Sequence, residues 1–260
     1  MKSFKACLYC EILKLKRSGI FWITIVFFMV VPLMFGLMMF IAQKPELSAK
    51  LGLIGTKAKL FGTNDWKGYF SLLIQMVGTI GLIGFGFVTS WVFGSEYSNR
   101  TIKDMLALPI SRTYIVIAKF TVILFWCLLL ILILYLISFI MGLLLHLPGR
   151  QPELIYEFSK RFLNTTLLTL LLCTPVGFLA SYSRGIIGPL GFVIVTLILA
   201  QFAGLTGLGP FFPWAVPGIY SVSQNAEGLS LVTASYFILL ITSLSGFFGT
   251  ILWWKNADQH

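Results

Sequence analysis

The side chains that could carry out catalysis or bind a metal are few and scattered along this chain. Cys7 and Cys10 form one C-x-x-C motif near the N-terminus, and the two histidines, His146 and His260, lie far from it. A zinc site normally needs a second cysteine pair or histidines at suitable spacing. We therefore interpret the two thiols as part of an amphipathic segment. An enzyme acting on lipids is also disfavoured, because no nucleophile–base pair or metal-ligand cluster is evident.

The sequence contains no motif for holding ATP and no groups typical of ion-coupled transport. The phosphate-loop pattern G-x-x-x-x-G-K-[ST] does not occur. Neither an acidic residue nor a histidine lies in the middle of any long apolar run, where proton- or sodium-coupled carriers bury such groups. We expect that the chain is not an enzyme and itself holds no cofactor or metal. Any transport would then take its energy from a partner.

Three polar residues do occur within the long apolar runs. Gln75 and Thr79 lie four positions apart in one run, and Gln201 lies in another. Polar groups in hydrocarbon tend to face protein or a cavity. These residues either line a path for a transported molecule or hydrogen-bond between helices, and the sequence leaves both interpretations open.

A dense group of charges lies between two apolar runs, in the stretch SEYSNRTIKDMLALPISR at 95–112. Thr101 fits a helix N-cap, and Asp104 resembles the acidic partner of a capping box. A short helix over 102–108 should follow, and Pro109 should end it. The stretch is therefore predicted to be an ordered elbow rather than a loose loop.

The predicted short helix is amphipathic. Ile102, Met105 and Leu106 share one face, whereas Lys103 and Asp104 fall on the other. Nothing in a bilayer requires such a helix, but a soluble partner would need one as a docking surface. A connector that only lies on lipid headgroups is the alternative.

Charged residues on both sides of the apolar face would orient a docked partner. Glu96 and Arg100 are four positions apart and would pair if that stretch is helical. We assign the orienting role to the charged residues Glu96, Lys103, Asp104 and Arg112.

The elements that would position these residues are membrane-spanning helices. Hydrophobic residues make up 58% of the 260 positions and charged residues 11%, whereas a soluble domain carries about a quarter charged residues. Several apolar runs exceed the ~18 residues that mark a spanning helix, and the alternation of a β-barrel is absent. We expect an all-α integral membrane protein with a single transmembrane domain over 1–260. The six predicted spans lie at about 20–42, 70–93, 113–145, 162–182, 187–209 and 232–254.

Two further segments are unusual. Residues 1–19 place apolar side chains at helical spacing among basic ones, which predicts an amphipathic interfacial helix before the first span. The stretch 204–229 carries three prolines, several aromatic residues and a single charge. Broken apolar backbone is tolerated at membrane depth where protein covers it, so we predict a re-entrant or interface-lying hairpin before the last span. An aromatic belt is the alternative.

The net charge of +10 is explained by lysines and arginines beside span ends, where anionic membrane lipids attract them. No basic run interleaved with aromatic residues lies outside the spans, so we expect no nucleic-acid partner. With the N-terminus inside, eleven Lys and Arg residues fall on the cytoplasmic side and eight on the outer side. This bias predicts that both termini are cytoplasmic.

The segment FGSEYSNRTIKDMLALPISRTYIVIAK at 93–119 resembles the signature segment of ABC-2-type permeases, the membrane subunits of a large class of ABC exporters. Their pattern is an acidic residue and an aromatic one, a Gly-Thr or similar, a Leu-rich turn, Pro, a small polar residue and Arg. The matching residues are Glu96, Tyr97, Thr101, Leu106, Pro109, Ser111 and Arg112. Arg100 departs from the pattern, because glycine is common there. The six-span layout is similar over the whole chain, and it most resembles the short bacitracin-resistance and lantibiotic-immunity permeases.

The resemblance implies specific partners and roles. The elbow at 95–112 would be the coupling helix, seated in a groove of a separate ATPase subunit that binds ATP and Mg. Residues 1–19 would be the connecting helix, and the hairpin with Phe211, Phe212 and Trp214 would belong to the extracellular gate. Two permease chains would pair, as a homodimer or a heterodimer, mainly through spans two and five. The location would be a bacterial cytoplasmic membrane.

Mostly apolar spans suit an amphipathic cargo better than a sugar or an ion. We therefore expect an exporter that moves a peptide antibiotic such as bacitracin or a lantibiotic by alternating access, powered by the partner ATPase. A permease for lipid or another hydrophobic cargo is one alternative, and a stand-alone carrier or channel without ATP coupling is another. A purely structural membrane scaffold is the third, and it would tolerate charge reversal in the elbow.

Overall fold

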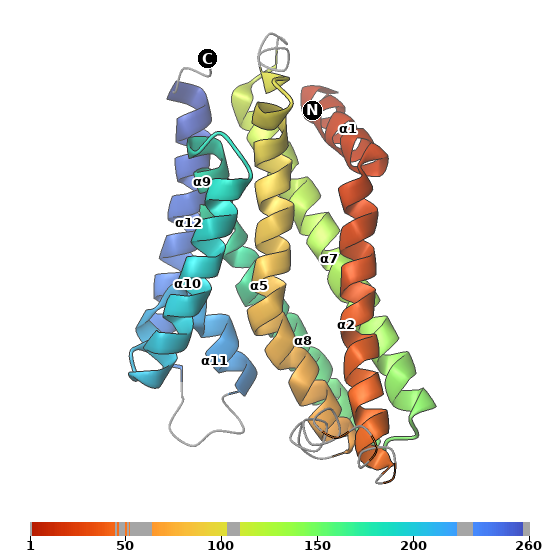
Figure 1. The fold of residues 1–260 in the computed structure, drawn as a ribbon. Coiled ribbons are helices and arrows are strands. Elements are labelled where there is room, and N and C mark those ends of the chain that lie inside the picture. Colours follow the sequence, from red (N-terminus) through yellow and green to blue (C-terminus); the bar gives the residue numbers. More distant parts are fainter. Residues whose placement is uncertain are drawn as a thin grey trace.

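We analysed a computed structural model, which describes residues 2–44, 46, 50, 52, 64–102, 110–222 and 231–256. Figure 1 shows these residues as a bundle of long helices, and no strand occurs among them. The main helices are α1 (Lys2–Arg17), α2 (Gly19–Gln43), α5 (Trp66–Ser98), α7 (Arg112–Leu144), α8 (Pro152–Leu171), α9 (Cys173–Tyr182), α10 (Ile187–Leu205), α11 (Val216–Val222) and α12 (Thr233–Asn256). Two 3-10 turns, η1 (Gly209–Phe211) and η2 (Pro213–Ala215), precede α11.

Six helical segments in the described residues are long and apolar enough to cross a membrane, which confirms the predicted number of spans. They are α2, α5, α7, the continuous pair α8–α9, α10 and α12. The fourth begins at Pro152, ten residues before the predicted start at 162, because the charged segment before the apolar run is also helical and proline is favoured at its first position. The fifth ends at Leu205 rather than 209, before the glycine and proline residues that begin the hairpin.

Helix α5 lies in the middle of the bundle and packs against α7, α8, α9, α10 and α11 (Figure 1). The start of α1, the end of α5, the start of α7 and the end of α12 all lie at one end of the bundle, which we call the termini end. The ends of α2 and α7 and the start of α5 lie at the opposite end. The elbow therefore lies at the same end as both chain termini.

The fourth span is broken between α8 and α9. Pro175 has no backbone N–H, so the carbonyl of Leu171 lacks its usual helical partner. Side chains supply the missing donors, because Thr174 Oγ1 donates to Leu171 O and Ser243 Oγ on α12 also donates to it. Thr174 Oγ1 is also within hydrogen-bond distance of Ser243 O. The break is thus stabilised by contact with the last span.

The apolar stretch after α10 folds back onto the bundle. The turns η1 and η2 and the short helix α11 pack against α5, α8 and α10. Ala215, Val216, Pro217 and Ile219 are buried there. The broken backbone is therefore covered by protein, and the rest of the predicted hairpin, 223–230, lies outside the described residues.

Helix α1 is amphipathic, as the sequence predicts, and it packs against α7. Cys7 and Glu11 are buried on its inner side, whereas Tyr9 and Cys10 are exposed. The C-x-x-C motif therefore separates its two thiols between the core and the surface. No group of three or more metal-binding side chains occurs among the described residues.

Candidate functional site

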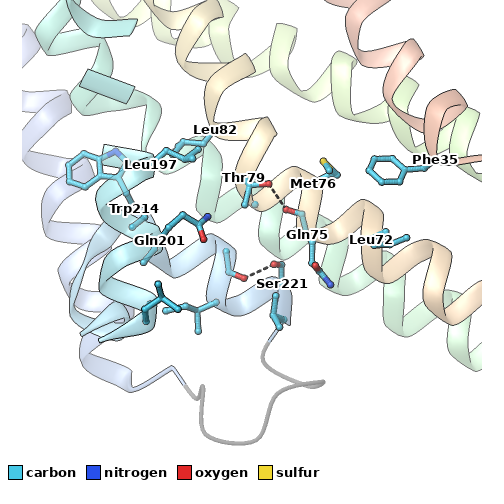
Figure 2. A pocket seen from close by; sticks show the side chains of 18 residues that line it. Phe35, Leu72, Gln75, Met76, Thr79, Leu82, Leu197, Gln201, Trp214 and Ser221 are labelled. Atoms are coloured by element: carbon cyan, nitrogen blue, oxygen red, sulfur yellow. Dashed lines mark hydrogen bonds between the residues drawn. The ribbon is translucent and has the colours of Figure 1, made fainter. Parts of the chain in front are cut away.

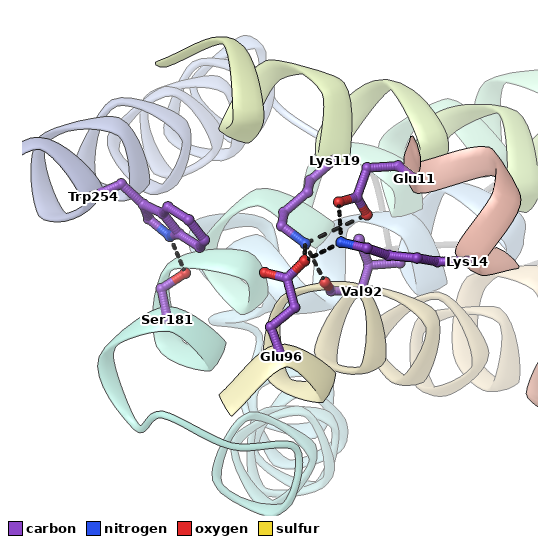
Figure 3. Close-up of polar contacts among 7 residues, drawn as sticks. All are labelled: Glu11, Lys14, Val92, Glu96, Lys119, Ser181 and Trp254. Carbon is purple, nitrogen blue, oxygen red and sulfur yellow. Dashed lines mark hydrogen bonds and ion pairs between the residues drawn. The ribbon is translucent and has the colours of Figure 1, made fainter. Parts of the chain in front are cut away.

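Four charged side chains meet at the termini end, where α1, α5 and α7 come together (Figure 3). Lys14 Nζ on α1 lies 2.8 Å from Glu11 Oε1 and 2.6 Å from Glu96 Oε1 on α5. Lys119 Nζ on α7 lies 2.8 Å from Glu96 Oε1 and 3.4 Å from Glu11 Oε2. We call these four residues the charged cluster. It contains two positive and two negative groups, so its charges balance.

The charged cluster is largely shielded from solvent. The side chain of Lys119 is 0% exposed and that of Glu96 is 4% exposed, whereas that of Lys14 is 45% exposed. Lys119 Nζ also donates to Val92 O at 2.8 Å. A buried lysine is tolerated only when its charge is paired and its donors are used. Lys119 meets both conditions through contacts with α1 and α5.

Burial and charge act in opposite directions on the pKa of Lys14. Burial alone lowers the pKa because it disfavours the ammonium form. The carboxylates of Glu96 and Glu11 outweigh this effect, and the pKa of Lys14 is raised above its ordinary value. Lys14 therefore keeps its charge throughout the physiological pH range.

The charged cluster flanks the elbow on both sides. Glu96 lies in the last turn of α5, three positions before Asn99, the C-cap residue. Lys119 lies two turns into α7, whose N-cap residue is Ser111. Because Lys14 and Glu11 contact both of these residues, α1 connects the helix entering the elbow with the helix leaving it.

The predicted helical pair of Glu96 with Arg100 does not form. Helix α5 ends at Ser98, so Arg100 lies beyond it, exposed and with a φ of 58°. Glu96 is directed inward to Lys14 and Lys119 instead. The interior charges of α1 and α7 are better partners, because burial strengthens an ion pair that solvent would screen.

The remaining elbow residues fall into three groups. Thr101 is exposed, whereas Ile102 packs into the protein's own core and is 6% exposed. Tyr97 packs against the same core and is half-buried. The predicted docking and orienting residues Lys103, Asp104, Met105, Leu106 and Pro109 lie outside the described residues.

Arg112 connects the start of α7 to the end of α12. Its Nη1 donates to Trp254 O at 3.0 Å and to Lys255 O at 3.4 Å. These carbonyls lie in the last turn of α12, which carries the negative end of the helix dipole. Trp254 is itself buried and donates from Nε1 to Ser181 Oγ at 2.9 Å (Figure 3).

A cavity of about 530 Å³ lies in the other half of the bundle, between α5, α10 and α11. Figure 2 shows that Gln75 and Thr79 from α5, Gln201 from α10 and Trp214 from η2 line it together. Thr79 Oγ1 donates to Gln75 O at 2.9 Å, which is a bond within α5. No charged residue lines this cavity in the part of the chain that the structure describes. The structure therefore brings all three predicted intramembrane polar residues to one place.

The predicted gate residues lie beside this cavity. Phe212 packs on Trp214 with ring centroids 5.6 Å apart, and Trp214 packs on Phe192 of α10 at 5.3 Å. Phe211 is exposed. Of these residues Trp214 alone contributes to the cavity lining, and Phe212 contacts Trp214.

Sequence reasoning missed three members of the charged cluster, Glu11, Lys14 and Lys119. In the sequence, Lys119 looks like one of the lysines and arginines that lie beside span ends. Its position eight residues into the helix that begins at Arg112 was the available signal. The i, i+3 spacing of Glu11 and Lys14 was a second signal.

Comparison with known proteins identifies relatives of this chain. Residues 7–200 match the family model described as "ABC-2 family transporter protein". The chain is similar to the "Bacitracin transport permease protein BCRB" of Bacillus licheniformis, with 24% identity over 188 residues, which cover 72% of this chain and 89% of that protein. No solved structure matches the chain.

Proposed function

The chain belongs to the ABC-2 family of transporter permeases, and from this premise we propose that it is the membrane-spanning subunit of an ATP-driven exporter. A separate ATPase subunit, holding ATP and Mg, would dock at the termini end. The cargo would be an amphipathic peptide antibiotic such as bacitracin or a lantibiotic. Transport would proceed by alternating access.

The observation that supports this proposal most strongly is the placement of the charged cluster around the elbow. A docked ATPase can drive transport only if movement of the docking segment is passed to the spans. Glu96 and Lys119 lie on the two helices that flank the elbow, and α1 connects them through Lys14 and Glu11. A push on the elbow would therefore move α1, α5 and α7 together. A connector that only lies on lipid headgroups would not need these contacts between α1, α5 and α7.

In this proposal the elbow residues divide their roles. Met105 and Leu106 would enter the groove of the ATPase, while Lys103 and Asp104 would orient it as the sequence predicts. The exposed Arg100 would join them in place of Glu96 and Arg112, whose side chains are engaged with other helices of the permease. Ile102 would anchor the elbow, because its side chain is buried in the core of the permease.

The cavity between α5, α10 and α11 is the proposed cargo path. Its walls are apolar and aromatic, and its polar groups are uncharged amides and hydroxyls. Such a lining suits an amphipathic molecule with uncharged hydrogen-bonding groups. The name of the relative from Bacillus licheniformis, a bacitracin transport permease, supports a peptide cargo over a lipid cargo. Trp214 and Phe212 would form part of the gate.

Two further parts of the proposal concern assembly and orientation. A second permease chain, identical or different, would pack against the exposed apolar face of α10, which includes Ile194, Ile198 and Phe202. The termini end would face the bacterial cytoplasm, as the distribution of lysine and arginine residues favours.

Affinity purification from native membranes tests the central claim. An ATPase subunit should co-purify with the wild-type permease and should be lost from the variant Met105→Asp/Leu106→Asp. Ser183→Asp, which adds a charge at an exposed turn between α9 and α10, is the matched control and should retain the ATPase. Recovery of the ATPase with both variants would refute docking at the elbow. Transport by the purified chain in liposomes without ATP would support a stand-alone carrier instead.

A further inference from the structure

A second cavity lies at the termini end, next to the charged cluster and between α1, the end of α5 and the start of α7. Its volume is about 760 Å³, within the range of ~300–1,000 Å³ that is typical of small-molecule sites. Ala6, Arg17 and Ser18 line it on one side, and Trp91, Asn99 and Thr101 line it on the other.

The polarity of this cavity changes with depth. Arg17 is the last residue of α1, and Asn99 and Thr101 follow the last residue of α5. Trp91 lies seven residues before the last residue of α5, which is about 10 Å deeper at 1.5 Å per residue. Along α5 the lining therefore passes from polar groups at the end of the helix to an aromatic group within the span. A phospholipid has the same gradient.

The charge of the cavity favours an anionic headgroup. Glu11 and Glu96 contribute to the lining, but Lys14 and Lys119 neutralise both carboxylates. Arg17 adds a further positive charge, and it has no ion pair among the described residues. The lining itself carries two positive and two negative charges, and the buried Lys119 behind Glu96 brings the surroundings to a net charge of +1, which favours a phosphate group over a cation.

We propose that this cavity binds one anionic phospholipid, with its phosphate at Arg17 and its acyl chain against Trp91. The lipid would contact α1, α5 and α7 together and would steady the helices that flank the elbow. This site differs from the proposed cargo cavity in location and in charge, and it does not depend on the identity of the cargo.

Native mass spectrometry of the purified protein, taken from nanodiscs that contain phosphatidylglycerol and phosphatidylcholine, tests the proposal. Wild type should retain one phosphatidylglycerol in preference to phosphatidylcholine, and Arg17→Gln should reduce that preference at least tenfold. Lys16→Gln is the matched control, because Lys16 is exposed on the same helix but does not line the cavity. A charge that attracts anionic lipid only through the surface potential changes binding by roughly fivefold. Lys16→Gln should therefore show no larger effect.

A variant without a charge change tests the cavity itself. Ala6→Phe should fill the space and reduce retention of phosphatidylglycerol, because Ala6 is an exposed lining residue that can accept a larger side chain. Arg17→Lys should keep most of the preference, which guards against a folding defect in Arg17→Gln. Equal losses in Arg17→Gln and Lys16→Gln, or full retention by Ala6→Phe, would overturn the proposal and indicate diffuse attraction to α1.

Discussion

The ammonium group of Lys14 lies 2.6 Å from Glu96 Oε1, and this contact joins residues that are 82 positions apart in the chain. Glu96 is simultaneously paired with the fully buried Lys119. The end of α5, the start of α7 and the N-terminal helix therefore meet at one carboxylate. These contacts fix the positions of α5 and α7 on either side of the elbow, and they are made by residues outside its central part.

Removing one member of the buried pair should be costly. In Lys119→Met, Glu96 keeps only Lys14 as a partner, and we expect a loss of about 3–5 kcal/mol in unfolding free energy. Lys14→Met should cost about 1 kcal/mol or less, because the Lys14 side chain is 45% exposed and solvent screens it. Thermal unfolding in detergent, followed by tryptophan fluorescence, measures both.

The double variant Lys119→Met/Glu96→Gln separates pairing from packing. It removes one positive and one negative charge and leaves the Lys14–Glu11 pair intact. Its cost should be smaller than the sum of the two single variants, because neither side chain is left as an unpaired buried charge. An additive cost would show that the contact contributes packing rather than charge compensation.

The two cysteines of α1 should react differently with a maleimide. In variants that keep one cysteine each, Cys10 should be labelled rapidly at neutral pH and Cys7 slowly. Cys7 is buried, and burial raises the pKa of its thiol, so less of the reactive thiolate is present. Lys14→Met should increase the labelling rate of Cys7 if the charged cluster holds α1 against α7. Equal rates for the two thiols in the wild-type background would contradict the placement of α1.

The same labelling assay gives a pH prediction. The pKa of Lys14 is raised in the folded protein, so its stabilising contribution is fully present below the ordinary lysine pKa of about 10.4. It is lost only as the pH rises through the higher folded value. The protection of Cys7, corrected for thiolate content, should therefore stay constant between pH 6 and 9. A release of Cys7 within that window would show that another group controls the docking of α1.

Arg112 should stabilise the end of α12. Arg112→Ala removes the donors to Trp254 O and Lys255 O and should cost about 1 kcal/mol. Backbone hydrogen exchange over 250–256 should become faster in this variant. Arg112→Lys keeps the charge and should preserve most of the protection, whereas Lys255→Ala, at an exposed position, should leave it unchanged. Unchanged exchange in Arg112→Ala would indicate that the contact is not formed in the membrane.

The spans were predictable because each depends on a local run of apolar residues. All six were confirmed, and even the break near Pro175 had a local signal in the proline itself. The cavity between α5, α10 and α11 was partly predictable, since Gln75, Thr79 and Gln201 are polar residues in apolar runs and such residues tend to face protein or a cavity. Their role in transport stays a proposal.

The charged cluster was not predictable from local patterns. Glu11 lies 108 positions from Lys119, and no spacing rule connects them. Lys119 resembles a flanking lysine that extends its side chain toward the membrane surface, which is the usual behaviour near a span end. Only the packing of α1 across α7 shows that the ammonium group points inward. Because of the same packing, Glu96 pairs with Lys14 and Lys119 and not, as expected, with Arg100.

The close approach of α5 and α11 gives a matched pair of glycine variants. A Cβ atom added at Gly78 would lie 2.9 Å from Pro217 O and 3.2 Å from the Cα atom of Gly218, and both contacts are with backbone that has little room to move. Gly78→Ala should therefore cost about 1–3 kcal/mol and should push α11 outward, which changes the lining of the cavity between α5, α10 and α11. At Gly81 the nearest atom, 3.6 Å away, belongs to Val77 of the same helix. Gly81→Ala should thus be neutral or slightly stabilising, because alanine favours helix more than glycine does by about 1 kcal/mol. Thermal unfolding, together with an assay of the resistance of cells to the proposed peptide antibiotic, distinguishes the two variants. Equal effects of both substitutions would contradict the contact between α5 and α11.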